Sequence, residues 1–305
     1  MRIERLALIG IGLINGSLAR DLKREGVVGE IVAAARNEET LTRARALGLA
    51  DRTTTNPAEA VRGADMVVLG VPVNACGEVA AAIGPGLSPT SIVTDVGSVK
   101  QTVIDAVLPR LGYPHRFVPG HPVAGTEHSG PDAAIEHLFR SRRCILTPVA
   151  DTDPDAVADV SAMWTAVGAE VDTMAARHHD QVLAITSHLP HLIAFSIVGT
   201  VDDLESHLKQ EVFKYAAGGF TDFTRIAGSD PTMWRDIFLA NKGSILEMLG
   251  RFTEDLVALQ RAIRWDEADT LFEMFQRTRA IRRDVVAAGQ AYDRRALPPD
   301  AEDGA

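Results

Sequence analysis

The chain has 305 residues, of which 46% are hydrophobic, enough to build one large domain or two smaller ones. A formal net charge of −10 and a pI near 5.4 argue against nucleic acid or an anionic membrane as the main partner. The two cysteines, Cys76 and Cys144, lie in no metal-binding or disulfide pattern, which favours free thiols in a reducing cytoplasm.

The apolar run at residues 6–19 follows a basic start and resembles a secretion signal. Gly10, Gly12, Asn15 and Gly16 interrupt that run, and Glu4 lies in the basic region, so we expect a strand and a turn instead. No other run approaches the roughly 18 apolar residues that a membrane helix needs. The sequence therefore predicts a cytoplasmic protein without a membrane partner.

The first half of the chain alternates short apolar runs with amphipathic segments. This alternation is typical of a parallel sheet that helices cover on both faces. The runs that we predict to be buried strands are residues 6–11, 31–35, 66–71, 91–96 and 144–149.

The pattern changes after about residue 150. Residues 154–168 favour a helix and 170–174 one last strand, and the helical segments beyond them are 177–202, 231–249, 252–264 and 267–290. We therefore predict an α/β domain over 1–173, an all-helical domain over 174–292 and a disordered tail over 293–305.

A glycine-rich turn, Gly10 to Gly16, follows the first predicted strand and opens a helix, as in the dinucleotide-binding fingerprint of a Rossmann-type domain. Gly10 allows the tight turn, and Gly12 lets the backbone approach a pyrophosphate at the helix N-terminus. The third glycine of the fingerprint is replaced by Asn15, so a turn without a ligand is the alternative. The expected cofactor contacts are Gly10, Ile11, Gly12, Leu13, Ile14, Arg36, Val71, Pro72 and Ser98.

The end of the second strand bears on the choice between NAD and NADP. NAD-binding domains usually place an acid there for the ribose hydroxyl. Glu30 has the right spacing but precedes the predicted strand, and Arg36 stands where a 2′-phosphate would lie. This favours NADP over NAD, unless Arg36 is only a solvated surface charge or Glu38 reaches back.

Residues 121–130, HPVAGTEHSG, show neither helical nor strand periodicity and predict a loop. His121 follows the end of a short strand, and Ser98 follows another. Because ligands bind beyond the carboxyl ends of parallel strands, we expect the two side chains to meet over a nicotinamide. There His121 is suited to act as a general base; a buried structural histidine is the alternative.

The helical half offers a matching set of polar side chains. Ser187 and His191 are four residues apart on one helix face, and Pro190 between them predicts a kink. Arg225, further along, is suited to clamp a carboxylate.

Plainer interpretations of the helical half remain open. Arg225 as an ion-pair partner of Asp222 and Trp234 as a core residue are two of them. His178 and His179 are expected on an exposed helix turn. Zinc ligation by His188 and His191 lacks further ligands, so no metal is predicted.

These motifs together resemble the prephenate/arogenate dehydrogenase family of tyrosine biosynthesis, from residue 5 to about 290. The resemblance rests, in this order, on GIGLINGSLA, DVGSVK, HPVAGTEHSG, TSHLPH and GFTDFTRIAGSDPTMWRDIF. It implies a Rossmann domain followed by an all-α dimerisation domain, and a homodimer through the latter. It also implies oxidative decarboxylation of prephenate and/or arogenate, both cyclohexadienol carboxylates, to 4-hydroxyphenylpyruvate or tyrosine, with hydride transfer to NAD(P)⁺.

The resemblance also implies roles for single residues. His121 corresponds to the base, Ser98 to a serine that orients base and substrate, and Arg225 to a carboxylate-binding arginine. The remaining residues correspond to groups around the substrate: Ser187 and His191 from the helical side, the pocket residues Thr126, Glu127 and Trp234, and Asp222 in an ion network with Glu127 across the dimer.

Two rival classes share parts of this pattern. β-Hydroxyacid dehydrogenases and imine reductases have the same domain plan but typically carry a catalytic lysine, and no lysine lies between Ala175 and Leu208. A nucleotide-sensing protein without turnover would not need Ser98, His121 and Arg225 together. No residue distinguishes prephenate from arogenate.

Overall fold

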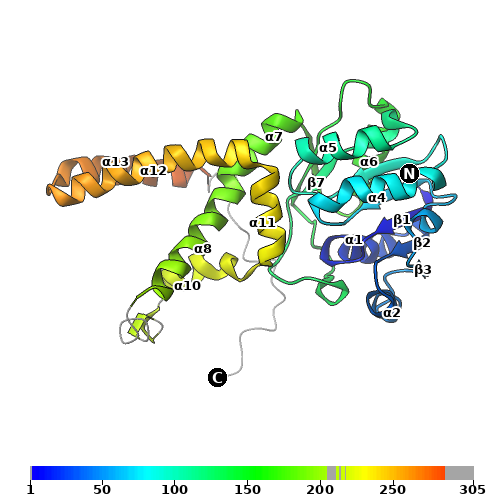
Figure 1. Cartoon of the computed structure of the whole chain (residues 1–305), viewed down its shortest axis with the longest axis horizontal. Coiled ribbons are helices and arrows are strands. Elements are labelled where there is room, and N and C mark those ends of the chain that lie inside the picture. The colour runs from blue at the N-terminus through cyan, green and yellow to red at the C-terminus, as the bar shows by residue number, and fades with distance from the viewer. Residues whose placement is uncertain (1, 205–210, 213, 217, 286–305) are drawn as a thin grey trace. The chain divides into compact units, whose positions relative to one another are not determined.

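The structure, a computed structural model, describes residues 2–204, 211–212, 214–216 and 218–285. The chain divides into two units, Met1–Met248 and Leu249–Ala305. The first holds the sheets and the helices up to α11, and the second holds most of α12 together with α13 (Figure 1). The predicted tail, 293–305, and the end of the predicted helix 267–290 lie outside the described residues.

The main sheet has six parallel strands in the order β3-β2-β1-β4-β5-β6. This order reverses between β1 and β4, which places a ligand-binding switch point at their carboxyl ends. The fold confirms the predicted Rossmann-type α/β domain. The strands are β1 (Ile3–Ile9), β2 (Val28–Ala34), β3 (Arg52–Thr54), β4 (Met66–Leu69), β5 (Ile92–Asp95) and β6 (Phe117–Val118).

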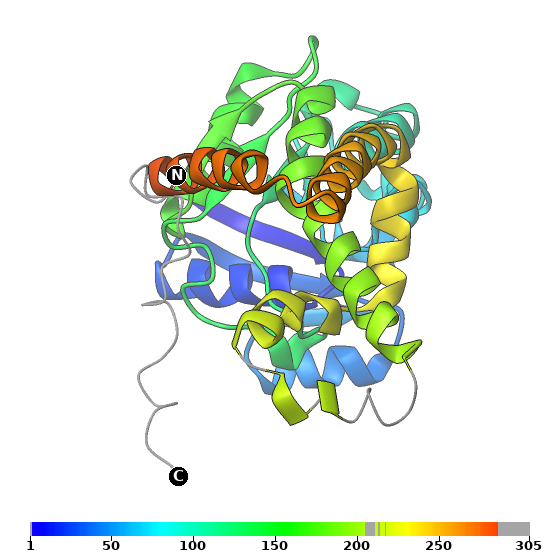
Figure 2. The same ribbon diagram turned by 90° about the vertical axis from the view of Figure 1, so that its left-hand side faces the viewer.

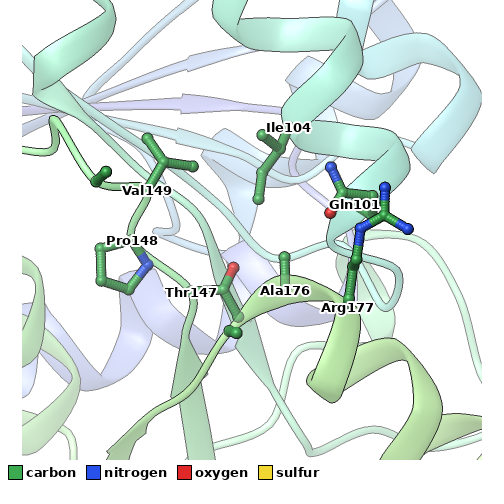
Figure 3. A pocket seen from close by; sticks show the side chains of 9 residues that line it. Gln101, Ile104, Thr147, Pro148, Val149, Ala176 and Arg177 are labelled. Carbon is green, nitrogen blue, oxygen red and sulfur yellow. The ribbon is translucent and has the colours of Figure 1, made fainter.

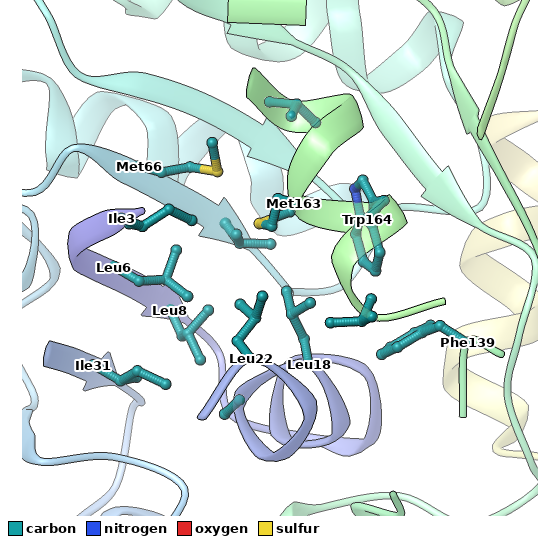
Figure 4. Packing of buried hydrophobic residues seen from close by; sticks show 14 of the residues in the cluster. Ile3, Leu6, Leu8, Leu18, Leu22, Ile31, Met66, Phe139, Met163 and Trp164 are labelled. Atoms are coloured by element: carbon teal, nitrogen blue, oxygen red, sulfur yellow. The ribbon is translucent and has the colours of Figure 1, made fainter. Parts of the chain in front are cut away.

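Helices cover both faces of this sheet because the side chains of β1 alternate between two apolar clusters. Leu6 and Leu8 face Leu18 of α1 and Trp164 of α6 (Figure 4), whereas the other cluster packs the opposite face of β1 against α3, α4 and α5. The helices are α1 (Leu13–Arg24), α2 (Glu38–Ala46), α3 (Pro57–Ala60), α4 (Cys76–Ile83), α5 (Gln101–Val107) and α6 (Pro154–Ala166).

A second sheet joins β7 (Gly120–Pro122), β8 (Arg143–Leu146) and β9 (Glu170–Thr173). β7 runs antiparallel to β8, and β8 runs parallel to β9. Two predictions were wrong here: His121 lies in a strand opposite Ile145, not in a loop, and the strand predicted at 144–149 is not part of the main sheet. A three-residue strand is too short to show alternation, so its pairing could not be read from the sequence.

The helical segment of the chain begins with α7 (Ala176–Leu183), a π-helical turn (Ala184–His188) and α8 (Leu189–Asp202), followed by α10 (Gly218–Thr224) and the 3₁₀ turn η7 (Arg225–Gly228). α10 and η7 lie against α8 (Figure 2). Beyond them come α11 (Pro231–Ala240), α12 (Lys242–Arg264) and α13 (Ala268–Val285).

One prediction about these helices was wrong. The break expected near residue 250 lies at Asn241 instead, because α12 runs through Gly250 at a cost of only about 1 kcal/mol. The segment Ala176–Asp202 is also long and apolar enough, by length and composition alone, to cross a membrane, and it is the one such helix among the described residues. One such helix does not establish a membrane span: 28% of its apolar window is buried, and the helix contains the buried polar residues His179, Asp180 and His188.

Candidate active site

The turn between β1 and α1 is shaped to receive a phosphate. Gly10 has a φ of +87°, and a Cβ there would lie 2.3 Å from the carbonyl oxygen of Gly70 and 3.2 Å from Val71, so only glycine fits. Gly12 caps α1 without a side-chain hydrogen bond, and a Cβ on it would meet nothing within 4 Å. The first N–H groups of α1 are therefore open to an anion, as a dinucleotide pyrophosphate requires.

Asn15 has a structural role in place of the expected third glycine. Its buried amide donates to the carbonyl oxygens of Gly10, at 2.7 Å, and Val68, at 3.3 Å. Gly16, the next residue, allows the close packing of α1 instead, because a Cβ there would lie 2.7 Å from the Cβ of Ala134. The glycine turn is thus tied to β4 by Asn15, and the close contact of the helix is moved by one residue.

Arg36 lies two residues beyond β2, exposed, and makes no ion pair with any described residue. Glu38, in the first turn of α2, is also exposed. β2 begins earlier than predicted and includes Glu30, whose carboxylate accepts a hydrogen bond from Arg5 at 2.6 Å near the amino end of the strand. Arg36 is therefore available to a ribose substituent, and Glu30 is at the wrong end of the strand.

His121 is buried and takes part in a hydrogen-bonded chain of three side chains. Its Nδ1 lies 2.8 Å from Nε2 of His179, and Nδ1 of His179 lies 2.9 Å from Oδ1 of Asp180. The Asp180 carboxylate also accepts from the backbone N–H groups of Lys100 and Gln101, at 2.8 and 2.9 Å. The expectation that His179 is exposed was wrong; its neighbour His178 is the exposed one.

A buried ion pair, missed in the sequence, supports the strand of His121. Asp95, the last residue of β5, pairs with the ammonium of Lys100, which also donates to the carbonyl oxygen of Gly120 at 2.6 Å. Asp95 accepts from the N–H groups of Gly97 and Gly120, at 2.8 and 3.1 Å. The D-x₄-K spacing in DVGSVK was the available signal. These bonds fix the loop of Ser98 against β7.

The predicted meeting of His121 with Ser98 takes a different form. His121 bonds to His179, and Ser98 lies half-buried after β5 without a hydrogen bond to the His121 ring. Ser98 is thus brought to the same sheet edge, but its hydroxyl is free to turn toward another partner.

The helical side contributes a stacked pair of rings. His191 lies over Trp234, with ring centroids 3.7 Å apart and an angle of 22° between the planes, and its Nδ1 bonds the carbonyl oxygen of Ser187 at 2.9 Å. Ser187 thus orients His191 through its backbone. Trp234 is also buried in the apolar cluster around Ile237, as the core interpretation predicts.

His188 shows no metal-binding arrangement. Its Nδ1 lies 3.2 Å from the amide of Asn241, and its Nε2 is buried with no hydrogen-bond partner. Among the residues that the structure describes, no group of three or more histidine, cysteine, aspartate or glutamate side chains is placed to hold a metal.

Arg225 pairs with Glu127 at 3.0 Å rather than with Asp222. The side chains of Arg225 and Glu127 are 49% and 31% exposed. Thr126 is exposed beside Glu127, with its hydroxyl accepting from the N–H of His128, and Asp222 is exposed on α10. Glu127 of the α/β part therefore meets the helical segment at Arg225.

Burial favours the neutral form of His121, His188 and His191. It lowers the pKa of His121 well below the ordinary 6.5, and the charges of His179, Lys100 and His188 lower it further. Burial likewise lowers the pKa of His188 to about 4. The pKa of His191 is lowered by burial against a raising hydrogen bond to Ser187. A neutral imidazole at His121 is the form that can accept a proton.

A separate pocket of about 330 Å³ lies beside the start of α5 (Figure 3). Its lining includes Gln101, Thr147 and Arg177 and none of the predicted site residues. We assign it no part in the reaction.

A Rossmann-type sheet with an open glycine turn, and a buried neutral histidine at the strand ends, define a nucleotide-dependent dehydrogenase. The chain belongs to the prephenate dehydrogenase family: residues 18–173 match its nucleotide-binding domain and residues 175–277 its dimerization domain. The protein is accordingly an NAD(P)-dependent dehydrogenase.

Relatives that the chain matches over most of their length support this assignment. The chain is 42% identical to the cyclohexadienyl dehydrogenase of Zymomonas mobilis over 92% of this chain and 95% of that one. It is 34% identical to the prephenate dehydrogenase of Bacillus subtilis, over 90% and 74%. The crystal structure of the A. aeolicus prephenate dehydrogenase with hydroxyphenyl propionate and NAD⁺ superimposes with a TM-score of 0.87, at 36% identity, covering 93% of this chain and 99% of that one.

Proposed function

We propose that this protein oxidises and decarboxylates prephenate, arogenate or both, with His121 as the acceptor of the ring hydroxyl proton. The observation that carries the proposal is the neutral, buried His121 at the edge of the sheet where the glycine turn opens. The family of the chain and the chemistry of its other polar residues support the same reaction.

The reaction balances with one base and one hydride acceptor. When bound, NAD(P)⁺ supplies the hydride acceptor. His121 takes the hydroxyl proton while the carbinol carbon is oxidised. The ring carboxylate leaves as CO₂, its bonding electrons complete the aromatic ring, and the proton returns from His121 to the resulting phenolate oxygen. Ser98, with a free hydroxyl near the same strand ends, is proposed to hold the substrate hydroxyl toward His121.

We propose that Arg225 binds a substrate carboxylate by exchanging it for Glu127. A half-exposed ion pair contributes at most about 1 kcal/mol, so a second carboxylate can displace Glu127 at little cost. The remaining residues assigned to the substrate surroundings are Ser187, His191, Trp234, Thr126 and Asp222.

For the cofactor, the proposed contacts are Gly10 to Ile14, Val71 and Pro72, together with Ser98. We further propose a preference for NADP, because Arg36 is exposed beyond the end of β2 and makes no ion pair with a described residue. We also propose a boundary between the two domains at residues 173 and 174, a homodimer formed through the helical domain, and a cytoplasmic location.

A four-way assay tests the activity. Prephenate or arogenate is offered with NAD⁺ or NADP⁺, and reduced nicotinamide is followed by absorbance. Turnover with either substrate is expected, with a higher kcat/KM for NADP⁺, and Arg36→Ala is expected to reverse that order. Bound cofactor without turnover in all four combinations would refute the proposed reaction, and a tenfold preference for NAD⁺ in the unmodified protein would refute the role of Arg36.

A further inference from the structure

The hydrogen-bonded chain from His121 through His179 to Asp180 has a donor-to-acceptor direction, which the Asp180 carboxyl determines. Both oxygens of Asp180 accept backbone N–H groups, from Lys100 and Gln101 at the start of α5. A backbone N–H can only donate, so both oxygens of the Asp180 carboxyl are held as acceptors. Asn241 donates to the carbonyl oxygen of Asp180 at 2.7 Å and fixes the backbone there as well.

This direction passes through both imidazole rings. Nδ1 of His179 faces an accepting oxygen and therefore carries a proton. In a neutral ring, Nε2 of His179 then has a lone pair and accepts the Nδ1–H of His121. A neutral His121 protonated on Nδ1 has its lone pair on Nε2, the nitrogen that is not engaged by His179.

We propose that His179 and Asp180 are positioning residues that hold His121 in the tautomer whose Nε2 accepts the substrate's hydroxyl proton. This inference rests on the proposed role of His121. The proton moves from the hydroxyl oxygen to Nε2, while the Nδ1–H of His121 remains in its hydrogen bond to His179. The positive charge that His121 acquires is offset through His179 by the carboxylate of Asp180.

The burial of this arrangement supports a positioning role. His179 is fully buried, Asp180 is 4% exposed and His121 is 8% exposed, so bulk water does not compete for their hydrogen bonds. The charges of His179, Lys100 and His188 each disfavour a charged His121. Asp180 is the carboxylate at the end of the hydrogen-bonded chain, and it reaches His121 through His179.

The test compares His179→Leu, His179→Gln and Asp180→Asn with His178→Gln, an exposed control on the same helix. His179→Leu is expected to lower kcat at least about 10-fold, toward the roughly 10²–10⁴-fold that a positioned base contributes, with little change in KM. His179→Gln is expected to recover part of this loss, because its Oε1 can accept the Nδ1–H of His121. Asp180→Asn should also lower kcat, and His178→Gln should leave it unchanged.

A second measurement does not depend on the variants. ¹⁵N NMR of the histidine rings in the unmodified protein is expected to show His121 protonated on Nδ1 and unprotonated on Nε2. His179→Leu is expected to mix the two tautomers, at an unchanged melting temperature and cofactor affinity. If His179→Leu does not fold, the ¹⁵N NMR tautomer of the unmodified protein and the kcat of His179→Gln test the inference instead.

Two results would overturn the inference: a protonated Nε2 on the neutral His121, or an unchanged kcat in folded His179→Leu. The proposed function fails differently. Full activity in His121→Asn would remove His121 from the reaction altogether, whereas a loss of activity in that variant but not in the His179 variants would refute the positioning role alone.

Discussion

At the scale of single residues, the site depends on keeping a histidine uncharged in a buried place. Burial lowers the pKa of His121 well below 6.5, so the neutral base persists as the pH falls from neutral to 6.5. We expect kcat/KM to fall on the acid side of its pH profile only well below pH 6.5, where His121 begins to bind a proton. The measurement is a pH profile of kcat/KM, with His128→Asn, an exposed histidine of the following loop, as the control.

An acid limb centred at or above pH 6.5 would contradict this assignment, since it would require a base with an ordinary or raised pKa. The control should reproduce the profile of the unmodified protein, because the ring of His128 is exposed and is assigned no role in the reaction.

In the proposed function, Arg225 exchanges its ion-pair partner Glu127 for a substrate carboxylate. Arg225→Ala removes a charge-assisted hydrogen bond of about 1.5–3 kcal/mol, which corresponds to a rise in substrate KM of roughly 10- to 150-fold. We expect kcat to change less than KM, because Arg225 binds the substrate without touching the reacting hydroxyl. Steady-state kinetics with Arg143→Ala, an exposed ion-paired arginine on β8, as the control tests this. A KM like that of the unmodified protein would make the pair of Arg225 and Glu127 purely structural.

At the scale of elements, the sequence predicted the long features and missed the short contacts between them. The strands at residues 66–71 and 91–96 contain β4 and β5, because buried parallel strands are continuous apolar runs. The three-residue strand of His121 carries no such signal. The partnership of His121 with His179, 58 positions along the chain, is set by how α7 packs on α5, which no local pattern encodes.

The glycine turn after β1 depends on a close contact between Gly70 and the side chain of Asn15. A Cβ on Gly70 would lie 2.3 Å from the amide nitrogen of Asn15, so Gly70→Ala must displace that amide from its two carbonyl partners. We expect Gly70→Ala to lower the free energy of unfolding by about 1–3 kcal/mol, the usual cost of overpacking. Asn15→Ala should cost about 1 kcal/mol for each hydrogen bond lost.

The two changes are coupled because they act on one contact. In Gly70→Ala/Asn15→Ala the added methyl fills space that the amide has left, so the loss should be smaller than the two single losses combined. Urea unfolding of the four proteins gives the coupling. Gly112→Ala is the control, since a Cβ there meets nothing within 4 Å. Strict additivity would mean that Gly70 and Asn15 do not share a contact.

At the scale of the whole molecule, α13 carries apolar residues that nothing in the described chain buries. None of its 18 residues is buried, and Phe272, Phe275 and Ile281 are each more than half exposed. Trp265, just before it, is 69% exposed. A helix with an uncovered apolar face is stabilised by a partner rather than by its own propensity. The matched dimerization domain, which covers much of α13, identifies a second copy of this chain as the partner we propose.

We therefore expect light scattering after size exclusion to give twice the 32.8 kDa chain mass. Phe272→Glu combined with Phe275→Glu should lower that mass toward one chain at low protein concentration, because two charges would be desolvated in the interface. The control is Glu273→Gln, on the same turn of the helix, which should leave the dimer intact. A single-chain mass for the unmodified protein at all concentrations would refute the homodimer, and an undiminished mass for the double variant would place the interface elsewhere on the helical domain.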